Sequence, residues 1–124
     1  MQGKIALEEH FATAATLADS QVFGAHVWNE LGPRLTDFQD KRLRLMDASG
    51  VEIMIASLNA PAVQAIHDVP RAVRVAHEAN DHLAAEIAKR PDRFAGFAAL
   101  PMQDPEAATN ELTRCVKEIG RAHV

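Results

Sequence analysis

A carboxylate and an imidazole lie two residues apart near the start of the chain, at Glu8 and His10. The run around them, residues 4–11, alternates apolar and polar side chains at its beginning, which is typical of a β-strand. Because side chains alternate between the faces of a strand, Glu8 and His10 are predicted to share one face, with Glu9 on the other. Such a pair can supply two ligands to a divalent ion, or it can be a solvated or salt-bridged pair. A complete metal site would need further ligands from elsewhere.

Strands and helices alternate along the chain and must position this pair. Apolar runs predict strands at three places, residues 4–11, 51–58 and 94–100. Capping residues and apolar side chains at spacings of three and four predict helices at residues 37–49, 68–87 and 104–118. Residues 12–31 show no clear period, so we expect a long loop with short helical pieces there, and Gly32–Pro33 is expected to break the chain.

This alternation predicts an α/β fold in which helical crossovers join parallel strands. The sheet belongs either to an open doubly wound domain or to a closed eightfold barrel, and ligands bind at the carboxyl ends of the strands in both. Glu8, His10, Ser57 and Asn59 all lie at or just past such ends. No Gly-rich phosphate loop follows the first strand, which disfavours nucleotide binding. Ser57 lacks a Gly-x-Ser-x-Gly frame, so it is not expected to be a hydrolase nucleophile.

Composition narrows the class of partner. The 124 residues are enough for one domain, and 48% of them are apolar, which allows a sizeable core. A net charge of −4 and scattered basic residues disfavour nucleic acid and anionic membrane surfaces, so a small molecule or another protein is the expected partner. No apolar run approaches the roughly 20 residues of a membrane span.

Two side chains with possible chemistry are interpreted as structural. Arg42 is predicted to belong to a solvated helix face, as most charges at such positions do. Cys115 is predicted to be a small residue on a helix face. As the single cysteine it excludes an internal disulfide framework and fits a reducing compartment, so a cytoplasmic protein is expected.

Four separated blocks of the sequence point to one protein family. They are Lys4–Phe11, Arg42–Gly50, Ser57–Gln64 and Lys89–Glu106. Together they resemble the metal-dependent decarboxylases of the amidohydrolase superfamily. The resemblance runs in order over about residues 1–118. Many superfamily members carry His-x-His on the first strand, whereas Glu-x-His, as at Glu8 and His10, is similar to the branch that acts on hydroxybenzoates.

The resemblance implies a fold and a site. The fold would be a (β/α)₈ TIM barrel, of which this chain supplies the first three strand–helix units. The site would hold one divalent ion, zinc or manganese, with Glu8 and His10 as its first two ligands. Phe23 and Asn59 would be substrate-binding residues for a small aromatic carboxylate. The proton donor and the remaining ligands would come from later strands, so no catalytic residue is assigned within the chain.

The resemblance also implies that the full-length parent is a homo-oligomer and that the fragment by itself is inactive. Residues 119–124 depart from the family pattern and match the translation, in one frame, of a common short-read sequencing adapter, so they are expected to be a non-native tail after a barrel portion at residues 1–118. Two other functions stay open. One is a metal-dependent hydrolase of small amides or lactones, and the other is a non-enzymatic α/β binding module.

Overall fold

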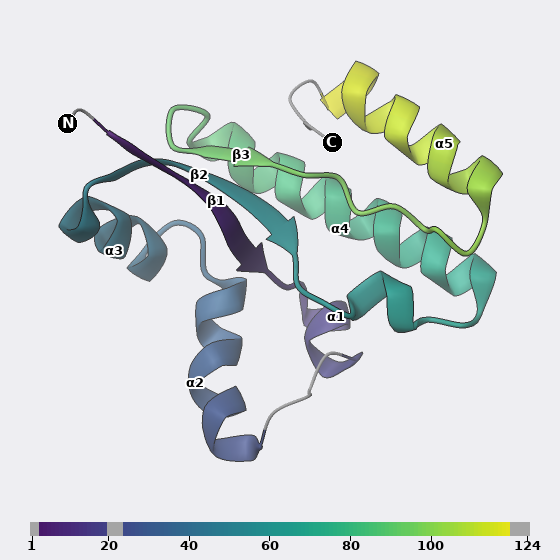
Figure 1. Ribbon diagram of the computed structural model, residues 1–124, viewed down its shortest axis with the longest axis horizontal. Helices are drawn as coiled ribbons and strands as arrows, with labels where there is room; N and C mark the ends of the chain where they lie inside the picture. Colours follow the sequence, from purple (N-terminus) through teal and green to yellow (C-terminus); the bar gives the residue numbers. More distant parts are fainter. Residues whose placement is uncertain (1–2, 20–23, 120–124) are drawn as a thin grey trace.

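Three parallel strands form the sheet in the computed structural model, which describes residues 3–19 and 24–119 (Figure 1). The strands are β1 (Lys4–Phe11), β2 (Val51–Leu58) and β3 (Phe94–Gly96), and they lie in the order β1-β2-β3. β2 pairs in parallel with both neighbours. The predicted α/β class and the predicted positions of the first two strands are therefore correct.

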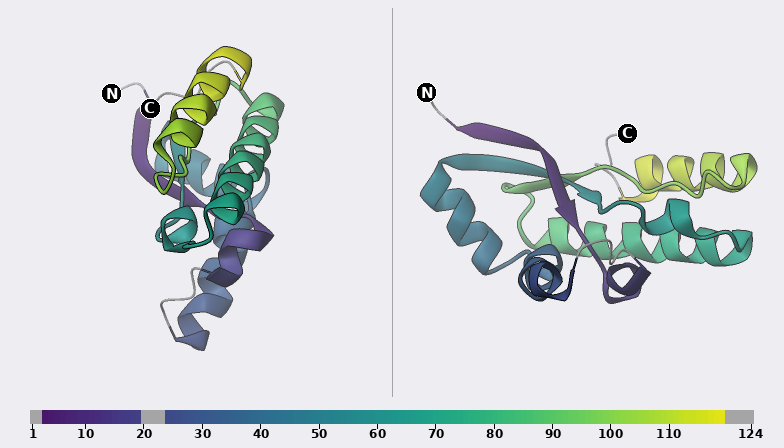
Figure 2. Two further views of the ribbon diagram at one scale, coloured as in Figure 1. Left: turned by 90° about the vertical axis from the view of Figure 1, so that its right-hand side faces the viewer. Right: turned by 60° about the horizontal axis from the view of Figure 1, so that its bottom comes forward.

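Helices cover one face of this sheet. The helices of the described chain are α1 (Ala14–Asp19), α2 (Ala25–Thr36), α3 (Lys41–Ser49), α4 (Val69–Lys89) and α5 (Pro105–Arg114), with a 3₁₀ turn η1 (Ala62–Ala65) and a π-helical turn η2 (Cys115–Ile119). Figure 2 shows α2, α3 and α4 on one side of the strands. The other face leaves Ile5 and Leu7 59% and 63% exposed. None of these helices combines the length and apolar character needed to cross a membrane.

Local signals explain where α4 and α5 begin and where α3 ends. The side chain of Asp68 accepts a hydrogen bond from the Arg71 N–H and caps α4, and Asp104 caps α5 in the same way. Gly50 ends α3 in the left-handed region, at φ +69°, which glycine adopts without steric cost. These helix boundaries agree with the sequence prediction to within a few residues.

The prediction that Gly32–Pro33 breaks the chain is wrong, because both residues lie inside α2. Proline lacks the N–H that the helix would use, and this normally disfavours an interior position. Tertiary packing outweighs the loss here, since α2 buries Trp28 and Leu35 against Ala12. We call these three residues the β1-exit cluster, because Ala12 directly follows β1. Residues 14–19 and 25–31 are accordingly helical, which is more helix than the long loop with short helical pieces that was predicted there.

The third strand is shorter than the predicted 94–100. The Phe97 N–H still donates to the Ala56 carbonyl, at 2.9 Å, so the chain stays beside β2 for one more residue. Beyond that point the Asn80 side chain takes both main-chain groups of Ala99, donating to its carbonyl at 2.9 Å and accepting from its N–H at 2.8 Å. A side-chain amide from α4 thus replaces the strand partner.

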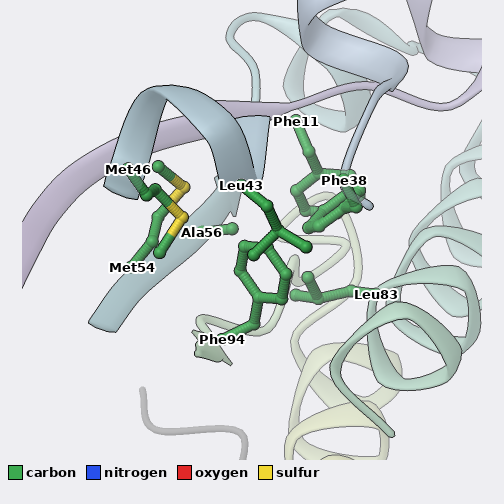
Figure 3. Packing of buried hydrophobic residues seen from close by; sticks show 8 residues of the cluster. All are labelled: Phe11, Phe38, Leu43, Met46, Met54, Ala56, Leu83 and Phe94. Atoms are coloured by element: carbon green, nitrogen blue, oxygen red, sulfur yellow. The ribbon is translucent and has the colours of Figure 1, made fainter. Parts of the chain in front are cut away.

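The main hydrophobic core lies between the sheet and the helices. Figure 3 shows its eight buried residues, Phe11, Phe38, Leu43, Met46, Met54, Ala56, Leu83 and Phe94. The rings of Phe38 and Phe94 meet edge to face with centroids 5.5 Å apart. Gly96 lets α4 approach closely, because an added Cβ would lie 2.4 Å from Leu83 Cδ2. The core therefore lies on the helix-covered face of the sheet, and side chains of β1 on the other face are exposed.

Candidate metal and substrate site

The predicted metal ligands lie near the carboxyl end of β1. Glu8 and His10 are both exposed, Glu9 is half-buried and Phe11 is buried in the core. This order of exposure is the one expected if Glu8 and His10 face away from the helices. Their assignment as metal ligands remains a prediction.

A register shift in β1 affects this pair. β1 has one residue more than β2 between Ala6 and Glu9. A bulge of this kind bends a strand and re-aims the side chains within it. Glu8 lies in the bulge, whereas His10 follows it in regular register. The orientation of Glu8 is therefore set by the bulge as well as by strand alternation.

The imidazole of His10 has a hydrogen-bond partner on the neighbouring strand. His10 pairs with Ser57 in the β1–β2 register, and its Nδ1 lies 3.1 Å from Ser57 Oγ. The Ser57 hydroxyl also lies 3.5 Å from the Glu9 carbonyl oxygen, to which it donates. The sequence signal for this contact was present, since both residues end neighbouring strands, but the pairing itself was not predicted.

The prediction that Arg42 belongs to a solvated helix face is wrong, because this residue is only 9% exposed. Its guanidinium donates to the main-chain carbonyls of His10 at 2.8 Å, Arg34 at 3.0 Å and Asp37 at 2.7 Å. Burial lowers the pKa of Arg42, and the carboxylates of Glu9 and Asp37 act in the opposite direction. A buried cation is tolerated where such acceptors replace water. Arg42 thus holds the end of β1 from the helix side.

Asn59 lies at the carboxyl end of β2, as predicted. Its side chain is buried, at 6% exposure for the residue, and its N–H donates to the Phe11 carbonyl at 2.9 Å. Its Oδ1 has no hydrogen-bond partner among residues 3–19 and 24–119. Asn59 lines a cavity of about 350 Å³ formed by residues 57–64, 97–100 and 102. A buried acceptor without a partner beside a cavity is suited to a ligand that donates a hydrogen bond.

Side-chain amides hold the rim of this cavity in place. They donate to main-chain carbonyls across the loops after β2 and β3: Gln64 to Leu100 at 2.9 Å, and Gln103 to Val63 at 2.6 Å and to Ile66 at 2.9 Å. Hydrogen bonds of this kind cross between loops that are distant in sequence. The cavity is therefore framed by fixed main chain.

A charged network between α4 and α5 supports the same region. Buried Glu111 accepts from Asn80 at 2.8 Å and from Arg114 at 2.9 and 2.7 Å, and His77 Nδ1 lies 3.1 Å from it. Burial alone would raise the pKa of Glu111, but the hydrogen bonds from Arg114 and Asn80 outweigh it and hold the pKa at about 2. Cys115 is fully buried beside this network, and burial raises its pKa to about 12, which makes an unreactive thiol.

The chain places a carboxylate and an imidazole, Glu8 and His10, close together near the end of β1. In the part of the chain that the structure describes, no group of three or more His, Cys, Asp or Glu side chains is placed to hold a metal ion. A carboxylate and an imidazole on one exposed strand end fit a site whose other ligands come from further strands. A groove of about 380 Å³ runs beside them, between β1 and helices α2 and α3. Phe23, the other predicted substrate residue, lies outside the described residues.

Comparisons with known proteins agree with this geometry. A model of the Amidohydrolase family matches residues 23–122. Gamma-resorcylate decarboxylase of Rhizobium sp. (strain MTP-10005) is 64% identical over 121 residues, which make up 97% of this chain and 37% of the relative. A crystal structure of 2,6-dihydroxybenzoate decarboxylase complexed with 2,6-dihydroxybenzoate superposes with a TM-score of 0.93 at 62% identity, covering 98% of this chain and 38% of that one.

A second solved structure contains a metal. It is a dihydroxybenzoic acid decarboxylase of Polaromonas sp. JS666 with bound manganese and the inhibitor 2-nitroresorcinol, with a TM-score of 0.92 at 63% identity, covering 98% of this chain and 37% of that one. The expected divalent ion is therefore present in a close relative. These findings confirm the resemblance carried by the four sequence blocks, and they place the chain on the N-terminal part of barrel structures. The chain spans about a third of the length of the relatives it matches.

Proposed function

Because the chain belongs to the Amidohydrolase family, we propose that it forms the first three strand–helix units of a metal-dependent decarboxylase whose substrate is a hydroxybenzoate such as 2,6-dihydroxybenzoate. One observation carries the proposal. The exposed pair of Glu8 and His10 ends a strand beside a cavity-lining amide, Asn59, in a chain 64% identical to a gamma-resorcylate decarboxylase. Ligand sites in barrels lie at this end of the strands.

Glu8 and His10 would hold the divalent ion, manganese or zinc, together with ligands from further strands. Such an ion supplies Lewis-acid chemistry, by orienting and polarising a bound carboxylate and its neighbouring hydroxyl. Arg42 keeps the His10 main chain in place from the covered side, through the 2.8 Å bond to its carbonyl. The residues of this chain therefore bind and position, and the proton donor lies on another part of the barrel.

Asn59 and Phe23 would contact the substrate. The unpartnered Oδ1 of Asn59 can accept a hydrogen bond from a ring hydroxyl. Phe23 would supply an aromatic surface for the ring. Hydrogen bonding selects hydroxylated rings, because a ring without the hydroxyl would leave the buried acceptor unpaired.

The proposal also covers the native extent of the chain, its assembly state and its cellular compartment. Residues 1–118 would be the native barrel portion, with a non-native tail at 119–124. The complete protein would be a cytoplasmic homo-oligomer. The single reduced cysteine is in keeping with that compartment.

Metal content and product formation test the proposal in a barrel-length chimera, in which residues 1–118 of this chain are continued by the remaining sequence of the Rhizobium relative. We expect about one manganese per chain and release of carbon dioxide from 2,6-dihydroxybenzoate. Glu8→Ala should lose both. Glu52→Ala is the matched control, because Glu52 is an exposed carboxylate at the opposite end of β2.

Three results would overturn the proposal. Full manganese content in the Glu8→Ala chimera would remove Glu8 from the ligand set. Hydrolysis of small amides or lactones without carbon dioxide release from hydroxybenzoates would favour a hydrolase. A chimera that is folded but binds no metal would favour a non-enzymatic module.

A further inference from the structure

We propose that Ser57 is a positioning residue for His10, which fixes the imidazole in the tautomer with its proton on Nδ1 and leaves Nε2 to bind the metal. The inference rests on the proposed function, since it assumes that His10 is a metal ligand. It assigns a role to a residue at the end of β2 whose hydroxyl has no nucleophile frame around it.

The hydrogen-bond directions follow from the groups that surround the Ser57 hydroxyl. A hydroxyl has one proton to donate, and the Glu9 carbonyl oxygen, 3.5 Å away, can only accept. With its proton directed at Glu9, Ser57 Oγ can accept from His10 Nδ1, 3.1 Å away, in the tautomer that carries the hydrogen on Nδ1. A neutral imidazole has one ring proton, which leaves a lone pair on Nε2. Metal-bound histidines typically use their second nitrogen in this way.

The main chain on both strands is held where this contact forms. His10 and Ser57 are register partners, and the next strand-end contact, Asn59 N–H to Phe11 carbonyl, measures 2.9 Å. Arg42 fixes the His10 carbonyl from the helix side. The remaining freedom of His10 is rotation of its side chain. A hydroxyl on a paired strand restricts this rotation without any movement of the backbone.

The manganese dissociation constant of the barrel-length chimera tests this role, with the melting temperature of the metal-free form measured alongside. Ser57→Ala should weaken manganese binding by about 10- to 100-fold, the usual cost of losing a hydrogen bond behind a metal ligand. The metal-free melting temperature should stay close to that of the parent chimera. Ser57→Thr keeps the hydroxyl in a residue that suits strands, and it should restore most of the affinity.

Ser49→Ala is the matched control, because Ser49 is an exposed serine at the end of α3, and it should leave the dissociation constant unchanged. An unchanged dissociation constant in Ser57→Ala would overturn the inference. A large drop in the metal-free melting temperature of Ser57→Ala would also do so, because it would show a structural role. Failure of the proposed function is distinguishable, since it would appear as unchanged metal binding in Glu8→Ala or as a parent chimera that releases no carbon dioxide from 2,6-dihydroxybenzoate.

Discussion

The two ends of the sheet differ in how their polar groups are paired. At the amino end of the strands, Arg93 donates to the carbonyls of Val51 at 3.1 Å and Glu52 at 2.9 Å, and to Asp47 Oδ1 at 2.8 Å. At the carboxyl end, Asn59 Oδ1 and the side-chain oxygen of Gln103 are buried without a partner in the described chain. At the amino end these strand carbonyls are paired within the chain, whereas two side-chain acceptors at the carboxyl end are unpaired.

This difference suggests that the amino end of the strands contributes to stability and the carboxyl end to ligand binding. Buried polar atoms are normally paired, so unpaired ones call for an explanation such as a ligand or water. In barrels, residues at the amino ends of strands contribute mainly to stability and those at the carboxyl ends to function. Three predictions for the barrel-length chimera test whether this separation holds. They are ordered by their expected effect on the free energy of unfolding.

Glu111→Gln should have the largest effect, a loss of about 1–3 kcal/mol at neutral pH, because hydrogen bonds to a buried charge are strong. The Glu111 network frames the cavity through Asn80 and Ala99. The pKa of Glu111 lies below its usual value of 4.5, at about 2, so its stabilisation is present above pH 4.5 and is lost as the pH falls toward 2.

Urea unfolding of parent and variant between pH 7 and pH 3.5 measures this difference. The gap between the two should narrow below pH 4.5. A gap that stays constant, or that widens in acid, would show that the charge of Glu111 does not stabilise the fold. Glu78→Gln is the control, because it makes the same change at an exposed carboxylate of α4.

Arg93→Met should cost about 1–2 kcal/mol, because it removes the donor shared by two strand carbonyls and one carboxylate while keeping most of the side-chain volume. The manganese dissociation constant should not change. A variant with normal stability and weakened metal binding would contradict the separation of the two ends.

Asn59→Ala should have the smallest effect on stability, about 0.5–1 kcal/mol, since the amide oxygen that it removes has no partner and only the packing of the buried side chain is lost. Steady-state kinetics should show an increase in KM for 2,6-dihydroxybenzoate of about tenfold, as expected for one lost hydrogen bond. An unchanged KM would remove Asn59 from the substrate site.

Features set by neighbouring residues could be predicted from the sequence. Asp68 and Asp104 cap the helices that directly follow them, and Gly50 ends α3 through its own φ angle. The apolar runs at residues 4–11 and 51–58 also predicted strands β1 and β2 correctly. The positions of Glu8, His10 and Asn59 at strand ends follow from these elements.

Features set by distant partners could not be predicted. Arg42 is buried because carbonyls of three other segments surround it. Pro33 lies within a helix because the Trp28 and Leu35 side chains of α2 pack against Ala12. The bulge before Glu9 and the contact between His10 and Ser57 depend on the register of two strands that are more than 40 residues apart. Each of these is a tertiary effect without a local signature.

The β1-exit cluster gives the chain a built-in optical probe. Trp28 is its single tryptophan, and the chain contains no tyrosine. The indole is buried at 9% exposure against Ala12, the residue that follows the strand of Glu8 and His10. Indole fluorescence of the isolated chain therefore originates at one place, beside the proposed ligand strand. Its emission wavelength and quenching by iodide will report whether the end of that strand is ordered.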